Sequence, residues 1–194
     1  MELLKQLYRI SSKSGMEDSI KSFVLGHLAG LNLDVKTDGI GNVFITKGLA
    51  DRYPCVAAHL DEIHSPCVRE VVVEGDIVYT VDRLWNRVGC GADDKNGLWI
   101  IMNLLKTEPV LKAALFVQEE RSGDLAGCRG AGACDMSFFD DVKYILECDR
   151  KGSSDVVSTG KGDIRLCDEH FICQDLLDKY GYQIIAELDK CSEH

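Results

Sequence analysis

The chain has 194 residues, 45% of them apolar and only 3 of them prolines, which is typical of a globular protein and not of a disordered one. Its formal net charge of −10 argues against nucleic acid as a partner, because phosphates attract basic surfaces. No apolar run reaches the roughly 20 residues of a membrane span, and the N-terminus lacks the pattern of a signal peptide. Nine cysteines, odd in number and without a C-x-x-C pair, are expected to be free thiols. The sequence therefore predicts a cytoplasmic protein with no nucleic-acid or membrane partner.

Two helices are expected at the beginning of the chain. Leu3, Leu7 and Ile10 share one helical face, and a second apolar face runs through residues 20–31. Between these helices, Ser14 and Glu17 have the spacing of a capping box, which predicts hydrogen bonds that start the second helix. Short apolar or alternating segments then predict five strands, at residues 33–36, 42–46, 55–60, 68–73 and 76–81.

A glycine-bounded turn with two adjacent acids, Asp93 and Asp94, leads into the apolar run 98–105. A helix that is apolar nearly all round is buried in the middle of its domain. The turn therefore brings negative charge to the edge of the core, where charge needs a partner.

Strands and one more helix are expected in the second half of the chain. The helix is predicted to start at a cap at Asp168, and residues 121–134 are expected to form a loop with at most one helical turn. Strands that alternate with helices predict a three-layer α/β domain with a mixed, largely parallel sheet, and we expect residues 1–194 to form a single domain. The predicted strands lie at residues 113–117, 143–147, 155–158 and 183–186.

Acids or a histidine follow several of these apolar segments. In an open α/β sheet the ligand crevice lies beyond the carboxyl ends of the strands, so these groups are expected to converge. So many carboxylates around one imidazole would raise one another's pKa values strongly, and a divalent cation resolves that conflict. Imidazole with carboxylate is a ligand set typical of zinc. The residues concerned are His59 and Asp61, Asp93 and Asp94, Glu119 and Glu120, and Asp149.

Each of these motifs taken alone has an ordinary structural explanation. His59 fits a hydrogen-bonded core histidine, and the acids 93–94 fit a helix cap. Glu119 and Glu120 fit a solvated strand end. Taken together and in this order, H-x-D, G-A-D-D-K-x-G, E-E-x-x-G and a strand that ends in Asp resemble the dinuclear zinc peptidases of the aminoacylase and tripeptidase T group.

The resemblance implies a role for each residue. His59, Asp93 and Asp149 would bind a first zinc, and Asp93 would bridge to a second zinc held by Glu120. Asp61 would orient His59, and Glu119 would act as the general base that activates water for attack on a peptide or amide bond. The peptide bond after Asp93 would be cis.

The chain departs from the family pattern in two ways. Asp149 is followed so soon by the cap at Asp168 that no lid domain fits between them, so the chain resembles compact members. The family's second zinc also takes a histidine near the C-terminus, and His64, His170 and His194 are poor substitutes for it. The chain is thus expected to be incomplete at its C-terminus relative to the family, with a firm first zinc site and a weak second one.

Three interpretations stand at this point. The first is an aminopeptidase or tripeptidase acting on short peptides. The second is a catalytically weak metal-binding remnant of that family, and the third is an amidohydrolase of N-acyl amino acids. Association into a homo-oligomer through exposed strand edges is a further expectation.

Overall fold

A computed structural model of the protein describes residues 1–120, 123, 126–149, 155–157, 159–160, 164–165, 179 and 183–185. The chain divides into two compact units, Met1–Asp149 and Arg150–His194, and each unit is described by itself. Across the described ranges, none of the helices combines the length and the apolarity needed to cross a membrane.

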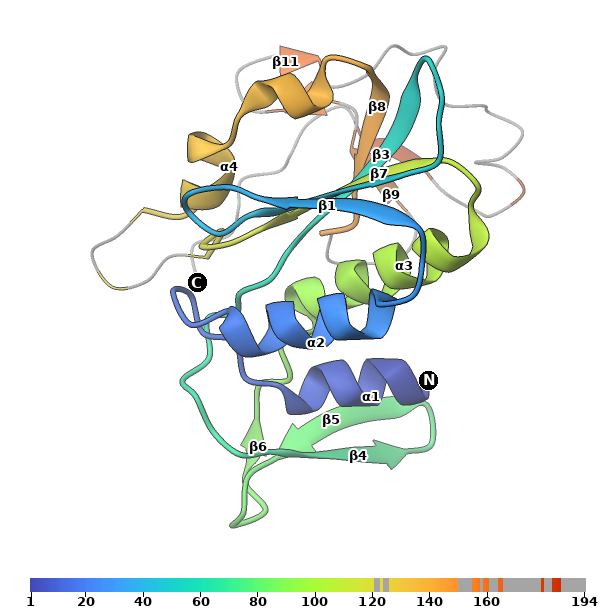
Figure 1. Ribbon diagram of the computed structural model, residues 1–194. Coiled ribbons are helices and arrows are strands. Elements are labelled where there is room, and N and C mark those ends of the chain that lie inside the picture. The colour runs from blue at the N-terminus through green and yellow to red at the C-terminus, as the bar shows by residue number, and fades with distance from the viewer. Residues whose placement is uncertain are drawn as a thin grey trace. The chain divides into compact units, whose positions relative to one another are not determined.

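The first unit is built on a five-stranded mixed sheet with the strand order β1-β2-β7-β3-β8 (Figure 1). β1 pairs with β2 and β2 with β7 in antiparallel fashion, whereas β3 pairs with both β7 and β8 in parallel. The parallel half of the sheet therefore has three strands whose carboxyl ends lie at one edge. The strands are β1 Leu33–Thr37, β2 Val43–Lys47, β3 Tyr53–His59, β7 Leu111–Phe116 and β8 Val142–Glu147.

Helices cover both faces of this sheet, as Figure 1 shows. On one face, α3 packs against β3 and β7, and both α1 and α2 pack against α3. On the other face, Phe44 of β2 contacts Phe138 and Phe139 of the short helix η1, which follows α4. The predicted three-layer α/β architecture with a mixed sheet is confirmed. The helices are α1 Glu2–Arg9, α2 Asp18–Leu28, α3 Ala92–Thr107, α4 Arg129–Ala133 and η1 Met136–Phe139.

The hydrophobic core lies between α3 and the sheet. Leu98, Ile101, Met102 and Leu105 of α3 are fully buried there, as the apolar run in the sequence predicts. Burial of each such side chain stabilises the fold by about 1.5–3 kcal/mol. The packed helix fixes the position of its own first turn, which carries Asp93 and Asp94 in a non-helical backbone conformation.

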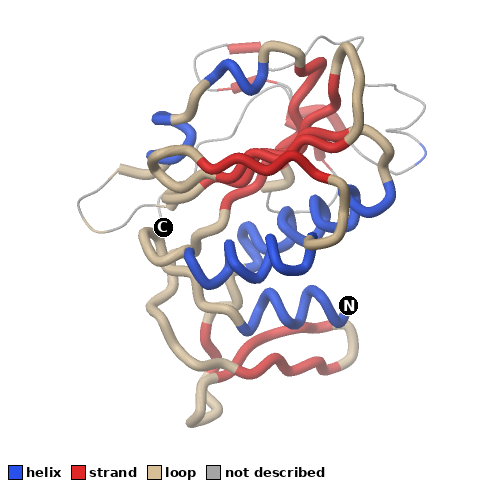
Figure 2. Tube along the Cα trace, in the orientation of Figure 1, coloured by secondary structure: helices blue, strands red, loops and turns tan. Residues whose placement is uncertain are grey.

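A second, three-stranded antiparallel sheet lies beside α1 (Figure 2). It contains β4 Glu70–Glu74, β5 Ile77–Val81 and β6 Arg87–Val88. The strands predicted at residues 68–73 and 76–81 form a hairpin, with Val73 opposite Val78. The two-residue strand β6 was too short to be predicted from sequence periodicity.

The described part of the second unit consists of short strand pairs. β9 Asp155–Val157 pairs in parallel with β12 Gln183–Ile185, and both lie where the sequence predicts strands. β10 Thr159–Gly160 pairs with β11 Ile164–Arg165 in antiparallel fashion. The predicted cap at Asp168 lies outside the described residues, as do His170 and His194.

The predicted capping box before α2 is wrong. The Glu17 side chain accepts hydrogen bonds from the backbone N–H groups of Gly15 at 2.8 Å and Gln118 at 3.1 Å, and the Ser14 hydroxyl donates to the carbonyl of Glu120 at 3.2 Å. These two side chains therefore hold the segment after β7 in place of capping their own helix.

Candidate metal centre

His59 occupies the last position of β3, at the edge where the parallel strands end. Its side chain is 2% exposed. Ring atom Nδ1 donates a hydrogen bond to the carbonyl oxygen of Asp61 at 3.0 Å, which leaves Nε2 directed at the acids. Nε2 lies 2.8 Å from Asp93 Oδ1, 3.7 Å from Asp149 Oδ2 and 3.9 Å from Glu119 Oε2. The strands thus bring together residues that are far apart in the sequence.

Asp61 organises the two glutamates as well as the histidine. Its buried carboxylate accepts hydrogen bonds from the backbone N–H groups of Glu119 and Glu120, both at 2.9 Å. Its Oδ1 also lies 3.5 Å from Nδ1 of His59. Burial alone would raise the pKa of Asp61, but the hydrogen bonds from His59 and from the two backbone groups lower it below its ordinary value. Asp61 is therefore ionised, and it fixes three of the converging residues.

The kinked first turn of α3 separates two neighbouring carboxylates. The Asp93–Asp94 peptide bond is cis, as the family resemblance predicts. Asp93 reaches His59, whereas the buried Asp94 accepts hydrogen bonds from the backbone N–H groups of Gly97 at 2.9 Å and of His59 at 3.3 Å. Asp94 thus caps α3 and also ties it to β3, a second contact that the sequence did not indicate. A Cβ atom at Gly97 would lie 2.4 Å from the Asp94 carboxylate, so this close packing requires glycine.

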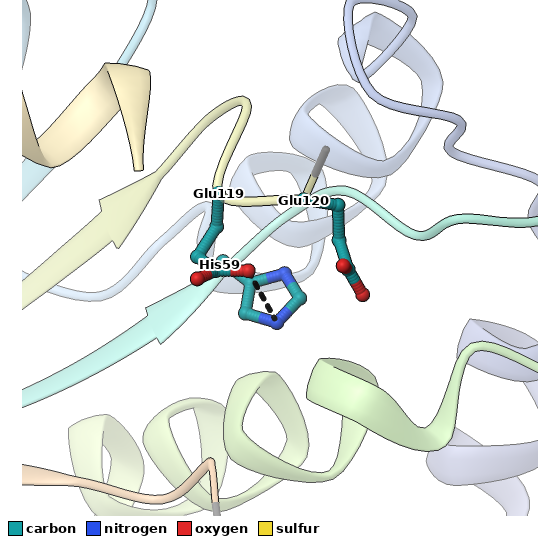
Figure 3. A group of neighbouring side chains, drawn as sticks. All are labelled: His59, Glu119 and Glu120. Atoms are coloured by element: carbon teal, nitrogen blue, oxygen red, sulfur yellow. Dashed lines mark ion pairs between the residues drawn. The ribbon is translucent and has the colours of Figure 1, made fainter. Parts of the chain in front are cut away.

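Two groups of side chains have ligand atoms that all lie within 4.8 Å of one another. The first is His59 with Asp93 and Asp149, and the second is His59 with Glu119 and Glu120. Figure 3 shows the second group, in which both glutamates leave the segment after β7 and a dashed line joins Glu119 to the ring of His59. The six residues selected from the sequence therefore converge. Among the described residues, His64 belongs to neither group.

The electrostatics of the site indicate a surplus of negative charge. Burial and the nearby charge of Asp93 raise the pKa values of Glu120 and Asp149 to about 7. Burial lowers the pKa of His59, but its hydrogen bonds with Asp61 and Asp93 and the charges of Asp94 and Asp149 outweigh that effect and raise it to about 11. Among the converging side chains, the protonated imidazole of His59 is the only group with a positive charge. The donor set therefore fits a divalent cation, which would neutralise the acids and take the place of that proton at Nε2.

Cys128 is a contact of the site that sequence reasoning missed. Its backbone N–H donates to the carbonyl of Glu119 at 2.6 Å, and its thiol lies 3.3 Å from Glu119 Oε1. Burial raises the pKa of this thiol to about 11, so it is protonated and can donate to the carboxylate. No motif of the sequence links Glu119 with Cys128.

A buried ionic cluster of Glu62, Arg69 and Lys95, called the Glu62 cluster below, lies next to the site. Glu62 Oε2 is 2.6 Å from Lys95 Nζ and 3.0 Å from Arg69 Nη2, and each of the three side chains is at most 1% exposed. The Arg69 guanidinium also donates to the backbone carbonyls of Tyr8 at 2.6 Å and Gly89 at 2.6 Å. The cluster joins α1, the start of β4 and the turn that carries Asp93.

The fold and the site together define a class: an α/β domain with a candidate histidine–carboxylate metal centre at the carboxyl ends of its parallel strands. Solved structures of peptidases are similar to the chain. A tripeptidase from Staphylococcus aureus and the aminopeptidase PepT from Bacillus cereus each match with a TM-score of 0.67 and 21% identity, over 82% of this chain and 45% of theirs. The TET1 peptidase of Pyrococcus horikoshii matches with a TM-score of 0.55 and 16% identity, over 94% of this chain and 82% of its own.

These likenesses confirm at the level of the fold the resemblance to zinc peptidases found in the motifs. The chain spans less than half the length of the tripeptidase and of PepT. No family model matches the sequence, and no curated protein matches it.

Proposed function

We propose that the protein is a zinc-dependent metallopeptidase that cleaves short peptides, with an aminopeptidase or tripeptidase type of action. The observation that carries this proposal is the convergence of His59, Asp93 and Asp149 on one point, with Glu119 Oε2 3.9 Å from the imidazole. The peptidase folds that the chain resembles support it. Zinc is the ion of choice because an imidazole and carboxylates form the donor set, whereas an all-oxygen set would favour magnesium or calcium.

The residues of the chain divide the work. His59, through Nε2, and the carboxylates of Asp93 and Asp149 would hold the ion, and a bound ion would polarise a carbonyl and make water easier to deprotonate. Glu119 accepts a proton from the attacking water at its carboxylate and delivers it to the leaving amine. Asp61 holds the backbone of Glu119 and the ring of His59 in place.

Glu120 is proposed as a ligand of a second, weakly held ion, with Asp93 as the bridge. Within the described residues, His59 is the one histidine in the candidate ligand groups. A second ion would therefore have no histidine ligand of its own among them and would be held by carboxylates. A cytoplasmic location and association into a homo-oligomer belong to the same proposal. The TET1 peptidase is described as assembling into a tetrahedron or a large octahedral shell, which supports the second of these.

Kinetics with Glu119→Gln test the proposal. The zinc-loaded full chain is assayed with di- and tripeptides and with N-acetyl amino acids, and the same assays are run on Glu119→Gln and on the surface control Glu74→Gln. We expect hydrolysis of peptides, a fall in kcat of about 10²–10⁴-fold in Glu119→Gln from loss of the general base, and no change in the control.

Three results would contradict the proposal. Activity that survives in Glu119→Gln would overturn the assigned mechanism. Hydrolysis of N-acetyl amino acids alone would identify an amidohydrolase. Firm zinc binding without turnover of any substrate would identify a metal-binding remnant.

A further inference from the structure

The first turn of α3 holds Asp93 in a backbone conformation that is not helical. The backbone angles are φ −83° and ψ 106° at Asp93, and φ −117° and ψ 42° at Asp94. Gly91, at the start of the helix, has a left-handed conformation with φ 62°. The Asp93 side chain is 66% exposed, so packing does little to fix its carboxylate. The position of this candidate ligand therefore depends on how the backbone around it is held.

The Lys95 side chain holds this backbone from within the protein. Its ammonium group, on a side chain that is 1% exposed, donates to Glu62 Oε2 at 2.6 Å and to the carbonyl of Cys90 at 3.3 Å. A Cβ atom at Gly91 would overlap the Glu62 carboxylate and would lie 2.6 Å from Lys95 Nζ. The ion pair therefore packs directly on the segment that leads into α3.

Glu62, at the other end of the ion pair, is fixed by its own backbone. Its N–H and carbonyl groups form a parallel β-bridge with the segment 12–14, with hydrogen bonds of 2.9 and 3.2 Å. Its Oε1 accepts a hydrogen bond from the N–H group of Ser12 at 3.1 Å, which leaves Oε2 for the cations. Glu62 also directly follows Asp61, the residue that orients His59. The ion pair thus joins the segment that orients one candidate ligand to the turn that carries another.

We propose that Lys95 is a positioning residue of the metal centre. Its ion pair with Glu62 holds the exposed carboxylate of Asp93 beside Nε2 of His59, at 2.8 Å, and so raises the affinity of the first ligand group for a divalent cation. This inference rests on the proposed function and deepens it, because it assigns the Glu62 cluster a part in metal binding in addition to its part in stability.

The charge of Lys95 acts in the direction opposite to this positioning effect. A buried ammonium group two residues from Asp93 repels a cation bound there, so loss of the charge alone would make the ion bind more tightly. Loss of the ion pair releases the turn and makes the ion bind more weakly. The sign of the change in metal affinity therefore separates the two effects.

Competition with a zinc chelator at pH 7 measures the metal affinity of the natural full chain and of Lys95→Met. Methionine is a flexible apolar side chain that adapts to a buried site, and Glu62 keeps Arg69 as its cationic partner, so the variant is expected to fold. The dissociation constant for zinc is expected to rise about 10–100-fold, the usual effect of losing a group that supports a ligand.

Glu62→Asp is a second variant, and it leaves the number of charges unchanged. Its carboxylate is one methylene shorter and is drawn back from the ammonium group of Lys95, so the geometry of the ion pair changes while its charges stay. Zinc is expected to bind about tenfold more weakly, at the lower end of the same range. An affinity equal to that of the natural protein would overturn the inference, even if Lys95→Met failed to fold.

Leu105→Ala is the control for a loss of stability without a change at the metal centre. Leu105 is fully buried near the other end of α3, and its truncation leaves a cavity that destabilises the fold. The zinc affinity of the folded protein is expected to stay within about twofold of the natural value, because the two sites are far apart. The absorption spectrum of bound Co²⁺, which reports the ligand geometry, is expected to change in Lys95→Met and to stay the same in Leu105→Ala.

An unchanged or tighter zinc affinity in Lys95→Met would overturn the inference, as would an equally weakened affinity in Leu105→Ala. Failure of the proposed function gives a different result. In that case the natural protein would bind zinc without hydrolysing peptides, while the difference in affinity between the natural protein and Lys95→Met would remain measurable.

Discussion

The metal centre and the Glu62 cluster are built from neighbouring residues but have opposite charge balances. Asp61 and Glu62 are adjacent, yet Asp61 supports the metal centre whereas Glu62 is buried between two cations. At the metal centre four carboxylates converge on one imidazole. In the Glu62 cluster one carboxylate lies between two buried cations, Lys95 and Arg69, and Arg69 also donates to backbone carbonyls.

The pKa values reflect this difference. Burial favours the neutral form of both glutamates, but in Glu62 the charge of Lys95 and the hydrogen bond from Arg69 hold the pKa below its ordinary value. In Glu120, burial and the charge of Asp93 act in the same direction and raise the pKa to about 7. In the Glu62 cluster every charged group has a charged or carbonyl partner, which is typical of a structural cluster. Uncompensated negative charge, in contrast, indicates a site for a cation.

The largest stability effect is expected for Glu62→Gln. The substitution leaves Lys95 and Arg69 buried without an anion, which typically costs about 3–5 kcal/mol of unfolding free energy. Urea unfolding of the two proteins measures the difference. Glu74→Gln, at an exposed glutamate, is the matched control and is expected to stay within about 0.5 kcal/mol. If Glu62→Gln and Glu74→Gln lowered the free energy of unfolding by the same amount, the structural role of the Glu62 cluster would be contradicted.

The same contribution has a defined dependence on pH. Because the folded pKa of Glu62 is lowered, its stabilisation is complete above the unfolded value of about 4.3 and is lost as the pH falls through the folded pKa. The stability gap between the natural protein and Glu62→Gln is therefore expected to shrink as the pH falls below about 4.3. A gap that widens on acidification would show that the sign is wrong.

An intermediate effect is expected for Asp61→Asn, which keeps the shape of the side chain but removes its charge. The amide can accept hydrogen bonds through one atom only, so one of the N–H groups of Glu119 and Glu120 loses its partner. Loss of such a supporting contact typically costs 10–100-fold in metal affinity. Competition with a zinc chelator measures it, and unchanged affinity would exclude Asp61 as a positioning residue.

The smallest effect is expected for Cys128→Ala. The thiol is a weak donor to Glu119 at 3.3 Å, and the backbone hydrogen bond of residue 128 is kept. The rate of peptide hydrolysis is therefore expected to change by less than about threefold, equivalent to less than the 1.36 kcal/mol of a tenfold change. A loss as large as that of Glu119→Gln would assign the thiol a direct part in the chemistry.

The metal centre was easier to predict from the sequence than the Glu62 cluster. His59 and Asp149 end or follow apolar strands, and the topology of a parallel sheet dictates that such positions meet at one edge. Arg69 and Lys95 have no such signal, because neither stands at the carboxyl end of an apolar strand. Their burial arises only when α1, β4 and α3 are packed together.

Local rules failed where long-range contacts compete with them. Ser14 and Glu17 have the spacing of a capping box, but both side chains form hydrogen bonds with the segment 118–120, which is more than 100 residues away in the sequence. In contrast, the strands predicted at residues 33–36 and 42–46 are joined by a loop with local contacts, because Asp38 satisfies the backbone N–H groups of residues 40–42 within that loop. Prediction from the sequence succeeds when the partners of a residue are its neighbours.

The central claim is that the first ligand group, His59, Asp93 and Asp149, holds a cation firmly whereas the second does not. Elemental analysis after extensive buffer exchange tests it most directly, on the natural protein and on the His59→Ala and Glu120→Gln variants. The account predicts one tightly held zinc per chain in the natural protein and in Glu120→Gln, and none in His59→Ala. Two tightly held ions per chain, or an ion that His59→Ala retains, would contradict it.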